Sequence, residues 1–234
     1  MSEAIDLGEF ARGSAMLKRR TSLADETAEI LRGMILLGKL PPGTPLPERE
    51  ISAALGISRT PLREAVRLLE KEGLVEYSPS RRPSVANPSL HEITNYLRVQ
   101  GALEALGGEL ACANATDDEL TAIARLNEEM QDLSGKDDPL TSFKRDMAFH
   151  SAIVAAGHNE PLSETHATYN ARLWRARFLS SQRESGREST QNEHQTIIDT
   201  LMTRNPEQTA AALKRHLNTA VINIANALRD SSPT

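Results

Sequence analysis

The chain has 234 residues, 39% of them hydrophobic and 25% charged, which suits two domains with cores of their own and excludes a largely disordered protein. It has no run of 18 apolar residues, no signal-peptide pattern and a single cysteine, so we expect a soluble, cytoplasmic protein without a membrane partner or an internal disulfide. The net charge of −5 is unevenly divided, because residues 11–88 hold 13 Lys and Arg against 9 Asp and Glu, whereas residues 89–234 hold 14 against 20.

Residues 1–20 are expected to form a flexible tail, because they show little helical periodicity. A helix is predicted from Ser22, which opens a capping-box-like sequence with Glu26, to near Gly38. This would be the first helix of an N-terminal domain that spans residues 21–86.

The segment from Leu46 to Glu76 predicts two helices around a tight turn. The first helix ends at about Leu55, since the next residue is a glycine, the residue that best adopts the left-handed conformation at a helix end. Ser58 is placed to cap the second helix with its hydroxyl, and that helix begins at about Arg59. The pattern is that of a helix-turn-helix.

The second helix of this pair carries a hydrophobic stripe and a basic stripe on different faces. The hydrophobic stripe consists of Leu62, Ala65, Val66 and Leu69, and the basic stripe of Arg59, Arg63, Arg67 and Lys71. A helix fits the major groove of B-DNA, where Arg pairs with guanine or with phosphate. A solvated amphipathic helix would show the same stripes, but the helix-turn-helix pattern favours contact with DNA.

A small two-stranded wing is predicted after this helix. Residues 74–77 follow Gly73 as a strand, residues 79–83 form a basic turn, and Val85 belongs to the return strand. The N-terminal domain would then be a winged helix-turn-helix of three helices and two strands.

The segment from residue 35 to residue 85 resembles the winged helix-turn-helix of GntR-type bacterial transcription regulators. The resemblance implies that the residues at the matching motif positions contact double-stranded operator DNA, namely Arg49, Ser58, Arg59, Thr60 and Arg63. The family's wing usually carries a glycine shortly before the return strand, where this chain has Arg82, Pro83 and Ser84. Arg82 is the residue through which the wing would reach DNA.

Residues 87–90 predict a linker, and the chain beyond it predicts helices alone. Six are expected, joined by short connections: 91–114, 116–133, 139–156, 161–182, 190–203 and 206–228. Such helices pack as an antiparallel bundle, here over residues 91–230. The whole protein is therefore predicted to be mainly α.

Four residues of the bundle suggest a metal site. Asp146 and His150 lie one helical turn apart, while His194 and His216 come from the last two helices. One carboxylate and three imidazoles suit zinc, nickel or manganese. Core histidines that are satisfied one by one through hydrogen bonds are the alternative that the spacing leaves open.

Residues 143–159 and 188–217 resemble the effector domain of the FadR-like branch of the same family, the FCD domain. The resemblance implies that Asp146, His150, His194 and His216 hold a divalent metal, zinc foremost, beside which a small organic acid binds. Members often carry an arginine four residues before a glutamate of the first bundle helix; here Gln100 precedes Glu104, and Arg98 is the substitute. Arg98 and Gln100 are therefore the candidate effector contacts.

Other polar residues of the bundle are assigned no site. His166 is expected at the surface, and Trp174 is expected to pack among solvated neighbours that include Arg177. No catalytic residues are predicted.

The two resemblances together imply a homodimeric repressor that binds a palindromic operator under the control of an organic acid. Two alternatives stay open: a regulator that responds to the metal itself, and a metal-dependent hydrolytic enzyme that activates water.

Overall fold

The computed structural model describes residues 22–132, 138–182 and 187–230, so the predicted tail of residues 1–20 lies outside the described part. The elements in chain order are α2 (Leu23–Leu36), α3 (Glu48–Leu55), α4 (Arg59–Lys71), β1 (Val75–Tyr77), β2 (Pro83–Val85), α5 (Leu90–Asn114), α6 (Asp117–Asp132), α7 (Pro139–Ala155), α8 (Glu160–Ser181), α9 (Arg187–Met202) and α10 (Pro206–Asp230). The mainly α fold with a two-stranded wing is confirmed. No helix in these described ranges is long and apolar enough to cross a membrane.

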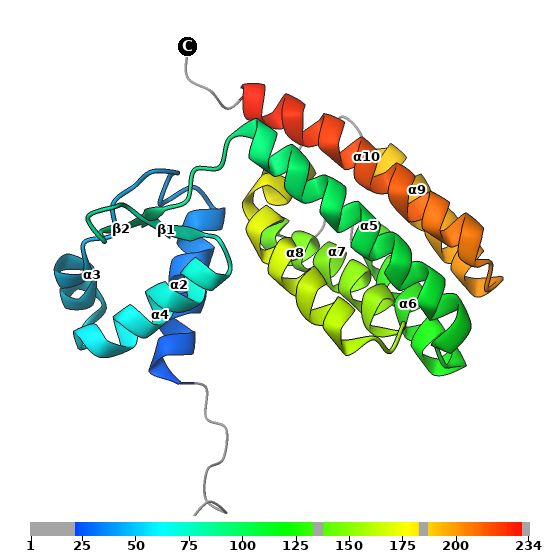
Figure 1. Ribbon diagram of the computed structural model, residues 1–234, viewed down its shortest axis with the longest axis horizontal. Coiled ribbons are helices and arrows are strands. Elements are labelled where there is room, and N and C mark those ends of the chain that lie inside the picture. Colours follow the sequence, from blue (N-terminus) through cyan, green and yellow to red (C-terminus); the bar gives the residue numbers. More distant parts are fainter. Residues whose placement is uncertain (1–21, 133–137, 183–186, 231–234) are drawn as a thin grey trace, which may run out of the picture.

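Helices α2, α3 and α4 and the β1–β2 hairpin form the N-terminal unit, which stands to the left in Figure 1. The strands are antiparallel, with Val75 opposite Val85. The hydrophobic stripe of α4 is buried against α2 and the hairpin in one cluster, which includes Leu31, Ile35 and Leu46. The predicted amphipathic pattern of α4 thus builds the core of this unit.

Two details of capping differ from the sequence prediction. The capping box at Ser22 is closed by Asp25 and not by Glu26, because the third helical position, which faces the cap, falls on Asp25. Ser58 does precede α4, but its hydroxyl makes no capping hydrogen bond. Gly56 is left-handed, with φ of 67°, as the turn requires.

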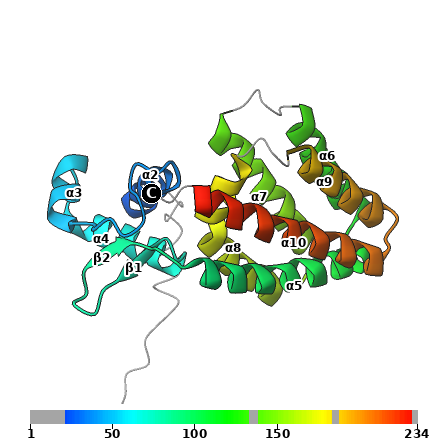
Figure 2. The ribbon, with the colours of Figure 1, turned by 90° about the horizontal axis from the view of Figure 1, so that it is seen from above.

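Helices α5 to α10 form a bundle, in which α5 and α10 run side by side in opposite directions (Figures 1 and 2). The long helix α5 lies against α7, α8 and α10. Glycines allow these close approaches: a Cβ at Gly108 would come within 2.5 Å of Leu213 on α10, and one at Gly107 within 2.8 Å of Val154 on α7. Helix α5 is therefore the central helix against which the others are placed.

One hydrophobic cluster joins the N-terminal unit to the bundle. Leu36, at the end of α2, is 2% exposed and packs with Phe143 and Met147 of α7 and Phe178 of α8. We call this group the Leu36 cluster. Arg172 of α8 also lies against Gly73, just after α4, where an added Cβ would overlap the Arg172 side chain. The two parts of the molecule thus meet through α2 and the end of α4.

Candidate DNA interface and metal centre

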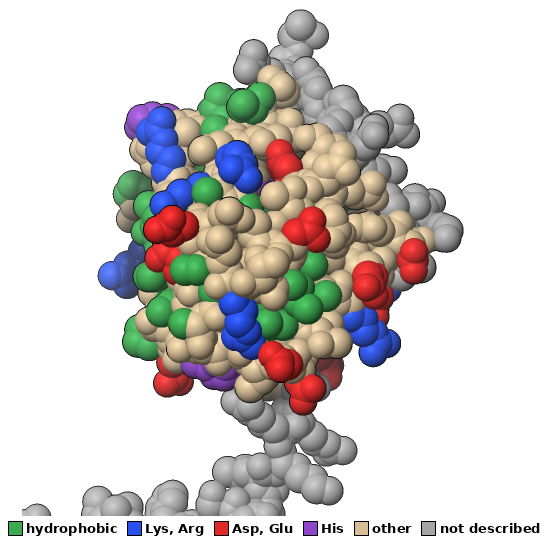
Figure 3. All heavy atoms as spheres, turned by 90° about the vertical axis from the view of Figure 1, so that its right-hand side faces the viewer, with side chains coloured by type: hydrophobic (Ala, Val, Ile, Leu, Met, Phe, Trp, Pro, Cys, Tyr) green, Lys and Arg blue, Asp and Glu red, His purple; other side chains and the backbone are tan. Residues whose placement is uncertain are grey.

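The predicted DNA contacts lie on the exposed side of the N-terminal unit. Arg49 projects from α3, Ser58 stands at the start of α4, and Arg59, Thr60 and Arg63 occupy its first turns, all of them exposed. Since α4 is fixed by its buried face, this outer face is free to enter a groove. The opposite end of the bundle mixes basic, acidic and hydrophobic side chains over its surface (Figure 3).

Arg63 is held by a neighbouring acid when no DNA is present. Its Nε lies 2.7 Å from Oε2 of Glu48, the first residue of α3. The Arg63 side chain is 58% exposed, so water and salt screen this pair and a phosphate can compete for the guanidinium. The ion pair positions Arg63 without removing it from the surface.

The tip of the wing is a tight turn from Ser78 to Arg82. The Arg81 N–H donates to the Ser78 carbonyl at 2.8 Å, and the Arg82 N–H donates to the Ser78 hydroxyl at 3.1 Å. Arg81 adopts a left-handed conformation, with φ of 57°, although it is not a glycine. The wing therefore forms without a glycine and presents Arg82 at the surface.

Three histidines predicted from separate segments converge inside the bundle. The rings of His150 from α7, His194 from α9 and His216 from α10 have centroids 4.7 to 5.4 Å apart, and their candidate ligand atoms all lie within 4.8 Å of one another. Asp146 joins two of them, because its Oδ1 lies 3.4 Å from His194 Nε2 and 3.8 Å from His150 Nε2. The structure thus places the four side chains selected from the sequence close together.

The chemistry of these side chains fits a divalent metal. Nε2 of His150 and Nε2 of His194 are buried and have no hydrogen-bond partner among the described residues. Burial lowers the pKa of both imidazoles, most strongly that of His194, so they are neutral at pH 7 and offer lone pairs. The ring nitrogens of buried histidines normally form hydrogen bonds to protein or water. A metal ion about 2.0 to 2.1 Å from each of these two nitrogens would take the place of such a hydrogen bond.

Asp146 is the anionic member of the group. Burial alone would raise its pKa, but the neighbouring His150, His194 and Arg177 outweigh that effect and lower the pKa. The carboxyl is therefore ionised at pH 7, as a metal ligand must be.

Arg177 and His166, which were expected at the surface, are buried beside this centre. Arg177 Nη2 lies 3.6 Å from Asp146 Oδ2, and Arg177 Nη1 lies 3.5 Å from Oε1 of the fully buried Glu104. His166 Nε2 lies 3.4 Å from the same Glu104 oxygen. Burial favours the neutral form of Glu104, yet His150, His166 and Arg177 hold its pKa well below the usual range.

A sequence signal for these buried residues was present. The inner face of α8 repeats at helical spacing, through Leu162, His166, Asn170, Leu173 and Arg177. Because three of its five members are polar, hydrophobic periodicity alone does not reveal it.

The two candidate effector residues lie on different sides of α5. Gln100 is fully buried and its amide donates to Glu104 at 3.2 Å, next to the centre. Arg98 is exposed and contacts Asn95 at 3.5 Å. Of this pair, only Gln100 reaches the polar groups around the histidines.

Comparison with protein families matches both halves of the chain. Residues 23–84 match the model of the bacterial regulatory proteins of the gntR family, and residues 95–219, more than half of the chain, match the FCD domain. The chain belongs to the GntR family. This GntR-family regulator accordingly binds DNA through its winged unit, and its relatives are transcription regulators rather than enzymes.

Individual relatives span nearly the whole regulator. The Glc operon transcriptional activator of Escherichia coli is 27% identical over 232 residues, which cover 89% of this chain and 91% of the relative. The transcriptional repressor NanR of Klebsiella aerogenes is 27% identical over 231 residues, covering 88% and 87%. The solved structure of E. coli McbR/YncC has the same fold, with a TM-score of 0.74 at 22% identity over 91% of this chain and all of that one.

Proposed function

We propose that this GntR-family regulator is a homodimeric repressor whose hold on a palindromic operator is controlled by a small organic acid bound beside a divalent metal. The observation that carries the proposal is the meeting of three buried imidazoles, two of which have an Nε2 atom without a hydrogen-bond partner among the described residues. Asp146, His150, His194 and His216 would hold the metal, with zinc as the first choice because it favours nitrogen and oxygen donors in this number.

The winged unit would read the operator through the side chains on α3, α4 and the wing. Arg59 and Arg63 at the N-terminal end of α4 would contact guanine edges or phosphates, and Arg49, Ser58 and Thr60 would contact phosphates. Arg82 would reach the neighbouring groove or backbone from the wing. A two-fold dimer would place one α4 in each half-site.

The bundle offers a guanidinium for an acid's carboxylate. Arg177 lies beside Asp146 and within reach of Glu104, to which Gln100 also donates. Arg177 therefore supplies, from α8, the positive charge that Gln100 does not supply from α5. A carboxylate next to the metal would find this guanidinium in the same buried space, which favours charge-assisted hydrogen bonds.

The Leu36 cluster provides the physical connection between the two halves. Met147 follows Asp146 on α7, and Phe178 follows Arg177 on α8, so each site residue has a neighbour that packs against Leu36. A shift of α7 or α8 on ligand binding would be transmitted to α2 of the winged unit. The ligand would then favour one placement of that unit through its differential affinity.

The test begins with an operator selected from random DNA by the purified, metal-loaded protein. The double variant Arg59→Ala with Arg63→Ala should bind the selected operator at least tenfold more weakly, and Arg125→Ala on the distant α6 should bind it normally. Elemental analysis of protein purified without chelator should find about one metal equivalent per chain. A normal metal load in His194→Ala would contradict the metal assignment, and operator release by metal ions alone would instead identify a metal-responsive regulator.

A further inference from the structure

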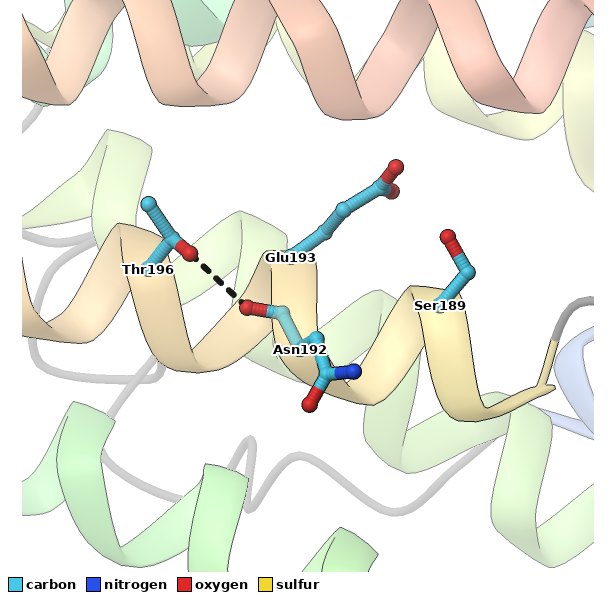
Figure 4. Close-up of a pocket in the computed structure, with 4 residues that line it drawn as sticks. All are labelled: Ser189, Asn192, Glu193 and Thr196. Atoms are coloured by element: carbon cyan, nitrogen blue, oxygen red, sulfur yellow. Dashed lines mark hydrogen bonds between the residues drawn. The ribbon is translucent and has the colours of Figure 1, made fainter.

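One carboxylate at the edge of the histidine cluster, which is not among the proposed metal ligands, accepts a hydrogen bond at each of its two oxygens. Glu193 of α9 accepts a hydrogen bond from Nδ1 of His216 at 2.9 Å and another from the Thr219 hydroxyl at 2.7 Å. Both donors are on α10. Figure 4 shows the Glu193 side chain pointing from α9 toward that helix.

We propose that Glu193 is a positioning residue for the metal site, which fixes the His216 ring so that its Nε2 faces the ion. This inference rests on the proposed metal site and adds to it a residue that does not itself bind the metal. A carboxylate that accepts from Nδ1 keeps the proton on that nitrogen, so the lone pair is left on Nε2.

The other histidines show why Glu193 matters for this ring. His150 also has a carboxylate at Nδ1, since Glu104 Oε2 lies 2.8 Å away. His150 is held on all sides by a fully buried environment. His216 is 6% exposed, the most of the three histidines, and Glu193 is the hydrogen-bond acceptor at its Nδ1.

The surroundings of Glu193 indicate that its side chain is not part of the hydrophobic core. Its side chain is 23% exposed and lines two surface cavities of about 340 and 410 Å³ between and beside α9 and α10, which Thr196 also lines. A carboxylate in contact with such water-accessible space is not needed to fill the core. Replacing it by the isosteric amide should therefore leave the fold intact.

The experiment measures metal affinity and fold stability in the same full-length variants. Zn²⁺ affinity is obtained by competition with a chromophoric chelator, and Co²⁺ absorption in the visible range reports the ligand geometry. We expect Glu193→Gln to bind Zn²⁺ about 10 to 100 times more weakly and to shift the Co²⁺ bands, with the metal-free protein still folded. The matched control is Asp199→Asn, an exposed carboxylate on the same helix that accepts from Gln195.

Thr219→Val supplies a second, milder variant. It keeps the Glu193 charge but removes the hydroxyl that holds one oxygen, so a smaller loss of Zn²⁺ affinity is expected. Equal Zn²⁺ affinity and identical Co²⁺ spectra in the wild type, Glu193→Gln and Thr219→Val would overturn the positioning role while leaving the metal site in place. Failure of the wild type to bind Zn²⁺ or Co²⁺ would overturn the metal site itself, and this inference with it.

Discussion

The pair of Arg63 and Glu48 determines what the recognition helix presents to DNA. Glu48→Gln removes an anion that both holds Arg63 and repels phosphate, so we expect operator affinity to rise a few-fold, with a steeper dependence on salt. Fluorescence anisotropy of labelled operator at several salt concentrations measures both effects. Glu50→Gln, on the same helix but at a more exposed position, should change affinity less; an equal increase in the two variants would point to general charge alone.

The candidate metal ligands could be predicted from the sequence, because residue type and spacing point to them. Asp146 and His150 are one turn apart, and the resemblance joined them to His194 and His216, which the fold indeed gathers. The buried states of Glu104 and Arg177 were not predictable in this way, because charged residues are usually solvated and only the packed helices place them face to face. Glu193 was missed for the same reason, since its role depends on a histidine 23 residues away.

The capping box at the start of α5 stabilises the helix that leaves the linker. Glu92 accepts from the Ser89 hydroxyl and backbone, and these hydrogen bonds lower the pKa of Glu92 below 4.5. A carboxylate with a lowered pKa in the folded state stabilises the fold above its unfolded pKa, and this contribution is lost as pH falls through the folded value. Glu92→Gln should therefore melt below the wild type at pH 7, and the difference should narrow only below about pH 4.5.

Thermal denaturation from pH 7 downward checks this prediction, with Glu109→Gln farther along α5 as the control. A difference that stays constant through pH 4 would mean that the Glu92 charge does not act through the capping box.

The Leu36 cluster fixes how α2 is attached to the bundle. Leu36→Ala removes a side chain that is 2% exposed and leaves a cavity among Phe143, Met147 and Phe178, so the free energy of unfolding should fall by about 2 to 5 kcal/mol. Leu37→Ala, at the next position but 49% exposed, should change it by no more than about 0.5 kcal/mol. Denaturant titration of the two variants measures the difference, and equal losses would contradict the observed packing.

Elements were predicted well because their boundaries carry strong local signals. Helix α10 begins at Pro206 and α7 at Pro139 as expected, and Gly56 ends α3. The contact between Leu36 and α7 could not be predicted, because it joins segments more than 100 residues apart and a leucine at a helix end has no distinguishing pattern. The sequence therefore predicts the individual helices and their boundaries better than it predicts how α2 packs against the bundle.

In the molecule as a whole, a basic N-terminal unit that binds DNA is joined to an acidic helical bundle. The bundle's central helix α5 starts directly after the linker and carries Gln100 and Glu104 into the polar centre. The α7 and α8 helices connect that centre to α2 through the Leu36 cluster. We propose that the metal-centred site and the operator site are energetically coupled.

The most direct test is the operator affinity of the metal-loaded protein, measured by fluorescence anisotropy with and without a panel of small carboxylic acids. We predict that at least one acid weakens operator binding tenfold or more in the wild type, that His194→Ala no longer responds to it, and that Arg125→Ala responds normally. Operator affinity that no acid alters, or a response that survives intact in His194→Ala, would contradict the coupling of the two sites.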